Sequence, residues 1–291
     1  MPSDDSKRVL GIKIDVDTYH GMKEGVPRLL NILGSEGIKG TFFLSIGPDS
    51  SGRAALQLIK NTRFLKKMVR TNAVGLYGLR TALYGTVLPS PMIALSFPTI
   101  VQEIMDQGHE VQFHAWDHRR WQDELLRKPA EWIRDWFERG IGGFVKLTGR
   151  HPTAFGAPAW MIDDRVMAVL KDYSFDYLSC TRARKPFIHE GIEIIEIPSD
   201  LPCFEEVGVP NGISIITEML RDGGTHVFPA HAEAEGGVWS GHFISLLAEV
   251  KKAGYSVTTL SEVKKQTSSE KLEVRKYRIE LLPGRSVPCA V

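Results

Sequence analysis

The sequence is poor in cysteine and carries almost no net charge. Its 291 residues include three cysteines, Cys180, Cys203 and Cys289, and none of them is spaced as C-x-x-C. This scarcity argues against a disulfide framework or a zinc knuckle and favours a reducing compartment. A net charge of +1 gives no reason to expect a nucleic-acid partner. The opening residues, MPSDDSKR, lack the basic and apolar pattern of a signal peptide, so we expect a location in the cytoplasm.

Acidic side chains are absent from residues 50–102, where seven lysines and arginines occur. Among them, Arg63, Lys66, Lys67 and Arg70 recur at helical spacing opposite an apolar face, which is typical of a helix lying on anionic lipid. A solvated face on a core-packed helix has the same pattern, and this alternative stays open. The uncharged stretch that follows is long enough to cross a bilayer, but three prolines interrupt it. We expect membrane docking by those four basic residues rather than a span.

Elsewhere, short apolar strands alternate with amphipathic helices. A strand at 9–14, a helix from about residue 24 and a strand at 40–44 form a βαβ unit, which favours a parallel sheet. This alternation of strands and helices continues to residue 258, and no obvious linker interrupts it. We therefore predict one α/β domain over 1–291, a distorted (β/α) barrel of seven or eight strands with its site at the carboxyl ends of the strands. The basic segment at about 50–98 is an insertion, and the tail from residue 266 has no assigned place beyond an appended strand at 274–282.

Acids and histidines follow three of the predicted strands. Asp15 and Asp17 end the first strand, His114 and His118 follow the strand at 110–113, and His231 follows the strand at 225–228. Histidines four apart on one helical turn can share a metal ion. Two imidazoles and a carboxylate leave room for water and substrate, as hydrolytic metal sites require, although the same set suits iron(II) oxygenases. His231 could supply a proton donor or acceptor at the same rim.

Two glutamates and six further histidines have less definite settings. Glu233 and Glu235 could hold His231, contact a hydroxylated substrate or be solvated. The remaining histidines follow no comparable strand, and we expect structural roles for them: His20, His109, His151, His189, His226 and His242.

Four phrases of the sequence resemble the motifs of the polysaccharide deacetylase (NodB-homology) family, and most closely its branch of 4-deoxy-4-formamido-L-arabinose-phosphoundecaprenol deformylases. They are IDVDTYHGMKEGVPRLL at 14–30, GPDSSGR at 47–53, HAWDH at 114–118 and HAEAEG at 231–236, in the family's order. The resemblance implies a distorted (β/α) barrel and one divalent ion of the Zn, Mn or Co class, bound by Asp17, His114 and His118. It also implies that Asp15 is the general base and His231 the general acid.

The resemblance further implies an activity. A deformylase of this branch removes the N-formyl group from undecaprenyl-phosphate-linked 4-formamido-4-deoxy-L-arabinose, which yields formate and the free amino sugar for lipid A modification and resistance to cationic peptides. A lipid-linked substrate implies a peripheral position on the cytoplasmic face of the inner membrane. We expect Tyr19, Trp160, Glu233 and Glu235 to contact the substrate. The alternatives are an N-deacetylase of another amino sugar or glycan, and a non-catalytic homologue that binds lipid or glycan.

The sequence departs from the family at one position. Members carry an arginine after the fourth strand, where it orients the catalytic base, but here residues 155–161 read FGAPAWM. The next arginine is Arg165, and either this residue or another group must orient Asp15.

Overall fold

The computed structural model describes residues 7–53, 84–85, 88–267 and 271–291. Arg63, Lys66, Lys67 and Arg70 lie outside the described residues, so the membrane-docking face stays a prediction. Within the described ranges, no helix combines the length and the apolar character that crossing a bilayer requires.

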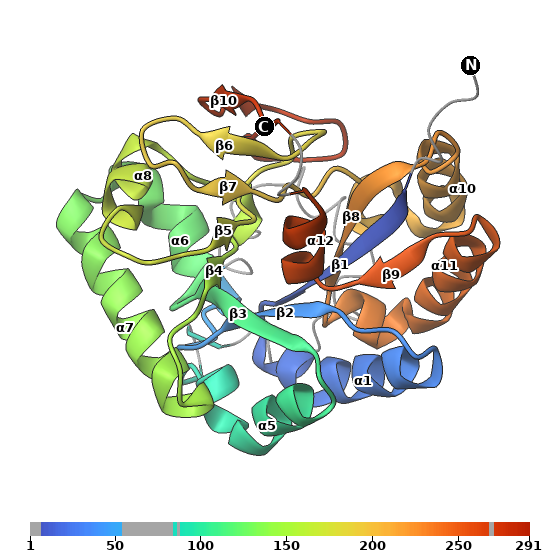
Figure 1. The fold of residues 1–291 in the computed structure, drawn as a ribbon. Coiled ribbons are helices and arrows are strands. Elements are labelled where there is room, and N and C mark those ends of the chain that lie inside the picture. The colour runs from blue at the N-terminus through green and yellow to red at the C-terminus, as the bar shows by residue number, and fades with distance from the viewer. Residues whose placement is uncertain (1–6, 54–83, 86–87, 268–270) are drawn as a thin grey trace.

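A curled, mostly parallel sheet forms the centre of the protein (Figure 1). Its strands are β1 (Arg8–Val16), β2 (Thr41–Ser45), β3 (Glu110–Ala115), β4 (Ala154–Phe155), β5 (Tyr177–Leu178), β6 (Phe187–His189), β7 (Ile195–Glu196), β8 (Gly224–His231), β9 (Ser256–Thr258) and β10 (Val274–Arg275). They are hydrogen-bonded in the order β10-β6-β7-β5-β4-β3-β2-β1-β8, and β9 pairs with the start of β1. The predicted barrel-like α/β class is confirmed, but the sheet of the described residues has ten strands rather than seven or eight, because the short strands β6 and β10 extend it at one edge.

Helices surround the convex side of this sheet, and α12 lies against its inner side (Figure 1). The α-helices of the described residues are α1 (Val26–Ser35), α5 (Pro98–Asp106), α6 (His118–Glu124), α7 (Ala130–Thr148), α8 (Asp164–Leu170), α9 (Phe204–Val207), α10 (Val209–Met219), α11 (Ser240–Lys252) and α12 (Leu260–Thr267). Single turns complete the set: η1 (Gly21–Gly25), η3 (Ala94–Ser96), η4 (Leu125–Arg127), η5 (Pro158–Trp160) and η6 (Ala234–Val238).

Strand β1 separates two environments by alternation of its side chains. Leu10, Ile12, Ile14 and Val16 face outward into the large core beneath the helices. The other set, residues 9, 11, 13 and 15, faces inward, because successive side chains of a strand point to opposite sides. At the bottom of this inner face, α12 packs so closely on Gly11 that a Cβ there would lie 3.0 Å from Val263. The inner face is therefore apolar near α12, and it carries carboxylates at the carboxyl end of β1.

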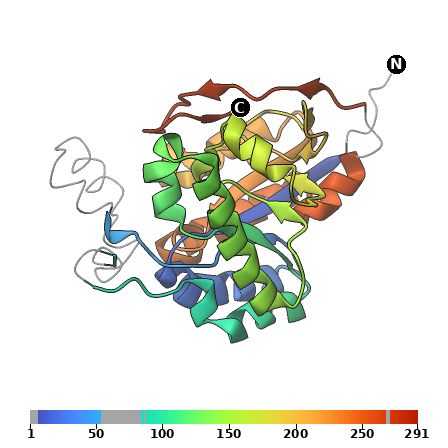
Figure 2. The ribbon, with the colours of Figure 1, turned by 90° about the vertical axis from the view of Figure 1, so that its left-hand side faces the viewer.

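The C-terminal segment runs along one edge of the molecule (Figure 2). The sequence predicted one appended strand at 274–282, but the segment forms two short ones: β10 joins β6, and β11 (Ile279–Glu280) pairs antiparallel with β12 (Cys289–Ala290). The break falls between them because residue 277 turns its tyrosine ring into the core while both neighbouring residues stay exposed. Cys289 and Val291 pack against Trp160, so the tail reaches the same end of the sheet as the predicted site.

Candidate metal centre

Asp17, His114 and His118 meet at the carboxyl ends of β1 and β3. His114 Nε2 lies 3.1 Å from Asp17 Oδ1, and His118 Nε2 lies 3.2 Å from Asp17 Oδ2. One potential ligand atom from each residue falls within 4.8 Å of the others. Asp17 Oδ1 and His114 Nε2 are buried and have no hydrogen-bond partner of good geometry. Buried polar atoms left without partners are rare, and here they converge on one point, which is the arrangement expected of ligands that share an ion.

The protonation states of the cluster also suit a metal. His114 Nδ1 lies 2.7 Å from the carbonyl oxygen of Gly156, so Nδ1 carries the proton and Nε2 keeps its lone pair. Burial, partly opposed by Asp17, lowers the pKa of His118 to about 4, and the imidazole is neutral near pH 7. Burial alone would raise the pKa of Asp17, but the imidazoles of His118 and His114 hold it well below its usual value. The donor set is one carboxylate and two imidazoles.

The two histidines do not share a helical turn, contrary to the interpretation of their spacing. His114 lies in β3, and His118 is the first residue of α6. Asp117 between them is extended and caps the helix, since its side chain accepts a hydrogen bond from the Arg120 N–H. The rings nevertheless face each other, with centroids 5.2 Å apart. The strand-to-helix turn therefore produces the convergence that a helical turn was expected to give.

Asp15 lies directly beneath this cluster and pairs with a lysine. Its side chain is buried, and Oδ1 lies 4.0 Å from His114 Nδ1. Lys13 Nζ forms hydrogen bonds with both oxygens of the Asp15 carboxylate, and the lysine is completely buried. We did not single out Lys13 from the sequence. Counting in steps of two back from Asp15 along the strand would have placed it on the same face.

His231 stands beside Asp15 on the neighbouring strand. The two residues are register partners in the parallel β1–β8 pair, so their side chains project from the same face of the sheet. Burial opposes the charged imidazole, but Glu205, Asp17, Glu235 and Asp15 together raise the pKa of His231. His231 Nδ1 is buried and unpartnered. A histidine whose acid form is favoured, next to a carboxylate, is suited to proton donation.

Both glutamates after His231 are buried rather than solvated. The His231 N–H donates to Glu235 Oε2 at 2.7 Å, and burial raises the pKa of Glu235 to about 7. Burial and the charge of Asp17 raise the pKa of Glu233 well above its usual value, and its carboxylate lies against Gly21. Glu235 therefore packs beside the segment that carries His231, and Glu233 packs beside the turn that follows Asp17.

Two aromatic residues flank the centre. Trp160 is almost fully buried, with its ring edge-on to His231 at 6.4 Å between centroids and against the guanidinium of Arg182 at 4.7 Å. Trp160 and Ala159 both have φ values near +54°, a region that non-glycine residues rarely adopt and that is common at functional sites. Tyr19 is half-buried at the rim, where its ring packs on Phe97 at 4.8 Å.

The phrase GPDSSGR holds the rim together. Asp49 Oδ2 accepts the Tyr19 N–H at 2.8 Å, and the Ser50 hydroxyl donates to Asp117 Oδ2 at 2.7 Å. The phrase thus connects the turn after β1 with the cap of α6, and so supports both arms of the metal cluster.

Arg165 does not reach the site. Its guanidinium donates to Asp163 and to the carbonyl oxygens of Leu125 and Lys128, between η4 and the start of α8. Asp163 is the N-cap of α8, so Arg165 stabilises the helix start rather than Asp15. Residues 155–161, after β4, contain no arginine that could take that role.

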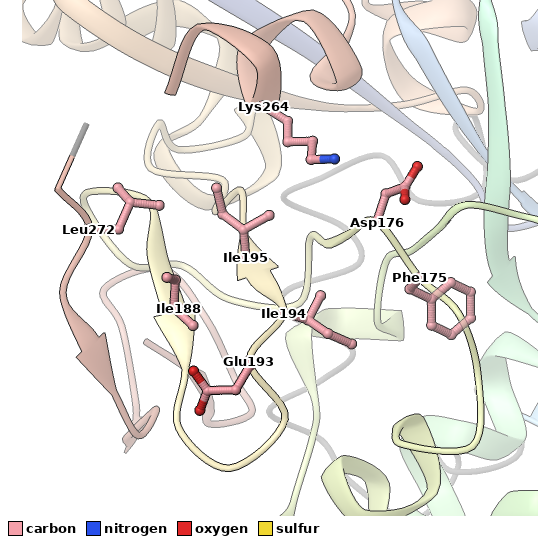
Figure 3. A pocket seen from close by; sticks show the side chains of 8 residues that line it. All are labelled: Phe175, Asp176, Ile188, Glu193, Ile194, Ile195, Lys264 and Leu272. Atoms are coloured by element: carbon pink, nitrogen blue, oxygen red, sulfur yellow. The ribbon is translucent and has the colours of Figure 1, made fainter. Parts of the chain in front are cut away.

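A separate hollow of about 310 Å³ opens at the opposite edge of the sheet (Figure 3). Its lining includes Asp176 and residues 193–195, which precede or begin β5 and β7, together with Lys264 from α12. These are the amino ends of the strands, so the hollow is not part of the metal centre.

Comparison with known proteins gives the family. The model of the polysaccharide deacetylase family matches residues 3–178. A protein of Shewanella sediminis, described as a probable 4-deoxy-4-formamido-L-arabinose-phosphoundecaprenol deformylase, is 32% identical over 87% of this chain and 85% of its own length. A protein of Wigglesworthia glossinidia brevipalpis with the same description is 29% identical over 91% of this chain and 96% of its own.

Solved structures share the fold. A Mycobacterium smegmatis protein assigned to the polysaccharide deacetylases superposes with a TM-score of 0.65 at 19% identity, over 97% of this chain and 98% of that one. The peptidoglycan deacetylase PdaC from Bacillus subtilis gives 0.52 at 14% identity, over 92% and 96%. The chain belongs to the polysaccharide deacetylase family. It is a hydrolase of amide bonds, of the deformylase or deacetylase type.

Proposed function

We propose that this protein removes the formyl group from 4-deoxy-4-formamido-L-arabinose carried on undecaprenyl phosphate. The observation that carries the proposal is the likeness to two relatives described by that activity, which extends over most of both lengths. The cluster of Asp17, His114 and His118 supports it, because hydrolysis of an unactivated amide needs a group that polarises the carbonyl.

In this proposal Asp17, His114 and His118 hold one divalent ion of the Zn, Mn or Co class. Their unpartnered atoms and the neutral imidazole of His118 fit such an ion. When bound, the ion polarises the formamide carbonyl and acidifies a water molecule. Gly156 keeps the His114 ring in the required tautomer, through the 2.7 Å contact with Nδ1.

Asp15 and His231 move the protons. Asp15 accepts a proton from the attacking water, and His231 donates one to the nitrogen of the departing amine. Asp15 and His231 are register partners on adjacent strands about 5 Å apart, which supports their assignment as neighbouring base and acid. The raised pKa of His231 favours the protonated imidazole that this step needs. Each transfer contributes roughly 10² to 10⁴ in rate.

Trp160 and Tyr19 contact the sugar, one at the floor and the other at the rim. Trp160 lies beside His231 and is almost fully buried, so we assign it to the floor of the sugar site rather than to stacking on the pyranose ring. We assign Glu235 to holding the backbone of His231 and Glu233 to packing against the turn after Asp17. Both carboxylates would then act on the shape of the site rather than on the sugar hydroxyls.

The insertion at about 50–98 brings the enzyme to its lipid substrate at the cytoplasmic face of the inner membrane. Its two described ends lie at the rim of the site: the Gly52 N–H donates to Tyr84 O at 2.9 Å, and the Tyr19 and Tyr84 rings lie 6.0 Å apart. Gly52 and Tyr84, the described residues on either side of 54–83, therefore lie next to the opening. Each basic side chain near an anionic membrane contributes about 1 kcal/mol, so Arg63, Lys66, Lys67 and Arg70 suffice for weak docking.

Formate detection tests the proposed activity. Purified protein is incubated with the formamido-arabinose lipid or its acetamido counterpart, and formate, acetate and metal content are measured. We expect formate release that is lost in His114→Ala together with the metal. Faster acetate release would replace the proposal with a deacetylase. Absence of both products from metal-loaded protein would leave a non-catalytic binding protein.

Liposome sedimentation tests the docking. We expect Lys66→Glu with Lys67→Glu to weaken binding to anionic vesicles while hydrolysis of a short, water-soluble formamido sugar stays intact. The matched control is Lys251→Glu with Lys252→Glu at the end of α11, which reverses the same charge on a different surface. Equal binding of both double variants to anionic vesicles would mean that residues 63–70 form an ordinary solvated helix face and do not dock to the membrane.

A further inference from the structure

Lys13 is a charged residue in the interior of the barrel. It is completely buried on the inner face of β1, one alternate position below Asp15. Its Nζ lies 5.0 Å from the ring centroid of Phe43 and 5.3 Å from that of Trp160. Transfer of an ammonium group into such surroundings is unfavourable by several kcal/mol unless a counter-charge accompanies it. The only counter-charge in contact with Lys13 among the described residues is the carboxylate of Asp15.

The other cations nearby are engaged elsewhere. Arg182 packs on the same Trp160 ring, but it donates to Glu206 and to the carbonyl oxygens of Ser199 and Leu201. Arg285 donates to Glu206 and to the Ala159 carbonyl oxygen. Since residues 155–161 contain no arginine, Lys13 is the cation that the described part of the chain presents to Asp15.

The Lys13–Asp15 pair also explains why Asp15 and Asp17 lie in different surroundings although their side chains project from the same face. Asp15 and Asp17 project from the same face of the chain, because they are two residues apart in an extended segment. Asp17 lies against the two imidazoles, whereas the carboxylate of Asp15 points down to the ammonium of Lys13. Because Lys13 holds both oxygens, the Asp15 carboxylate does not join the ligand set, and each oxygen keeps a second lone pair that can accept a proton.

We propose that Lys13 is the positioning residue for Asp15, and that it takes over the orienting role for which the family uses an arginine after the fourth strand. The inference rests on the proposed function only because that function makes Asp15 the general base. Lys13 does not touch the substrate; it fixes the rotamer of Asp15 through a charged hydrogen bond anchored in the barrel floor. A displacement of the base by about 1 Å lowers the rate about 10²-fold, so loss of Lys13 should affect kcat and leave KM unchanged.

Four variants test this inference against the wild type, with whichever amide the wild type hydrolyses. Lys13→Met removes the charge at similar volume, and Lys13→Arg restores a charge. Asp15→Asn removes the base, and the double variant Lys13→Met with Asp15→Asn removes both groups. Glu110→Gln is the matched control, since it disturbs a hydrogen-bonded network with Thr41 and Tyr177 at the amino end of the same sheet. Metal content and thermal unfolding are recorded for each protein.

The expected pattern has three parts. Lys13→Met loses about 10²-fold in kcat at unchanged KM and metal content, whereas Glu110→Gln loses stability but keeps its kcat. Lys13→Arg recovers to within about tenfold of the wild type, because a guanidinium also binds a carboxylate. The double variant is no slower than Asp15→Asn alone, because Lys13 acts only through Asp15.

Each of the opposite results would overturn the inference. Folded Lys13→Met with a kcat close to that of the wild type means that Asp15 needs no support. Lys13→Arg no better than Lys13→Met would mean that the charge is not what matters. If Lys13→Met does not fold, the double variant takes its place in the test, because it leaves no unpaired charge in the interior. A rate of the double variant well below that of Asp15→Asn would mean that Lys13 has a role independent of the base. Failure of the wild type to release formate concerns the proposed substrate and leaves this comparison valid.

Discussion

Gly25 and Gly236 allow the segment that follows His231 to pack closely against the start of the first helix. We therefore expect Gly25→Ala to lower both stability and activity. The two glycines are in backbone contact: a Cβ on Gly236 would lie 2.8 Å from the Cα of Gly25. A Cβ on Gly25 would lie 2.6 Å from the carbonyl carbon of Ala232, next to His231. Gly25 itself has ordinary helical angles, so alanine fits its backbone and the effect is purely steric.

The size of the effect follows from what must move. A carbon–carbon contact relaxes to about 3.5–4.0 Å, so the 232–236 segment has to shift by about 1 Å. The neighbour is backbone rather than a flexible side chain, and overpacking of this kind costs about 1–3 kcal/mol. Because the same segment follows His231 and contains Glu235, which accepts its N–H, we also expect kcat to fall about 10²-fold.

Urea unfolding and formate release measure the two effects. Gly142→Ala provides the matched control, since Gly142 is exposed within α7 and a Cβ there meets nothing within 4 Å. This control should gain about 0.5–1 kcal/mol from helix propensity and keep its activity. If Gly25→Ala is as stable and as active as Gly142→Ala, the close contact between η1 and η6 does not position His231.

Three further predictions follow from buried charges. Asp15→Asn should keep its metal, measured by elemental analysis, and lose about 10² to 10⁴ in kcat, since an amide cannot accept the proton; a near-wild-type rate would remove Asp15 as the base. Glu206→Gln should lower the free energy of unfolding in urea by about 3 kcal/mol, because Arg182 and Arg285 both pair with it in the interior; an unchanged midpoint would contradict this. Burial, with Lys39 nearby, lowers the pKa of His109 to about 4, so its contribution is present above pH 6.5 and is lost as the pH falls toward 4. His109→Gln should therefore lose about 2 kcal/mol less than the wild type between pH 7 and pH 4 in urea titrations, and equal losses would refute the assignment.

The regular part of the fold could be predicted because its strands and helices are long enough to show their periods. The strand predicted at 9–14, the helix from about residue 24 and the strand at 40–44 correspond to β1, to η1 with α1, and to β2. Strands β6 and β12 have two or three residues each, and their pairing depends on partners distant in sequence. No local pattern distinguishes such short segments from loops.

The candidate site could be predicted only as a list of residues near the ends of strands. The sequence brought Asp15, Asp17, His114, His118 and His231 to one rim, where the structure also places them. Lys13 was overlooked because its neighbours were interpreted as one apolar run rather than as two alternating faces. The burial of Glu233 and Glu235 arises from the approach of Gly25 to Gly236, a long-range contact that spacing within either phrase does not reveal.

The junctions of the 50–98 insertion have an evolutionary consequence. Gly52 and Tyr84 are joined by a backbone hydrogen bond, and Gly47 accepts the Ile93 N–H at 2.7 Å, so the chain leaves the barrel and returns to it at nearly the same place. Loop closure depends only weakly on length, so the segment between the junctions can be exchanged, lengthened or shortened without altering β2 or β3. Such a junction allows the barrel to acquire a new surface segment while the residues at the carboxyl ends of its strands stay unchanged.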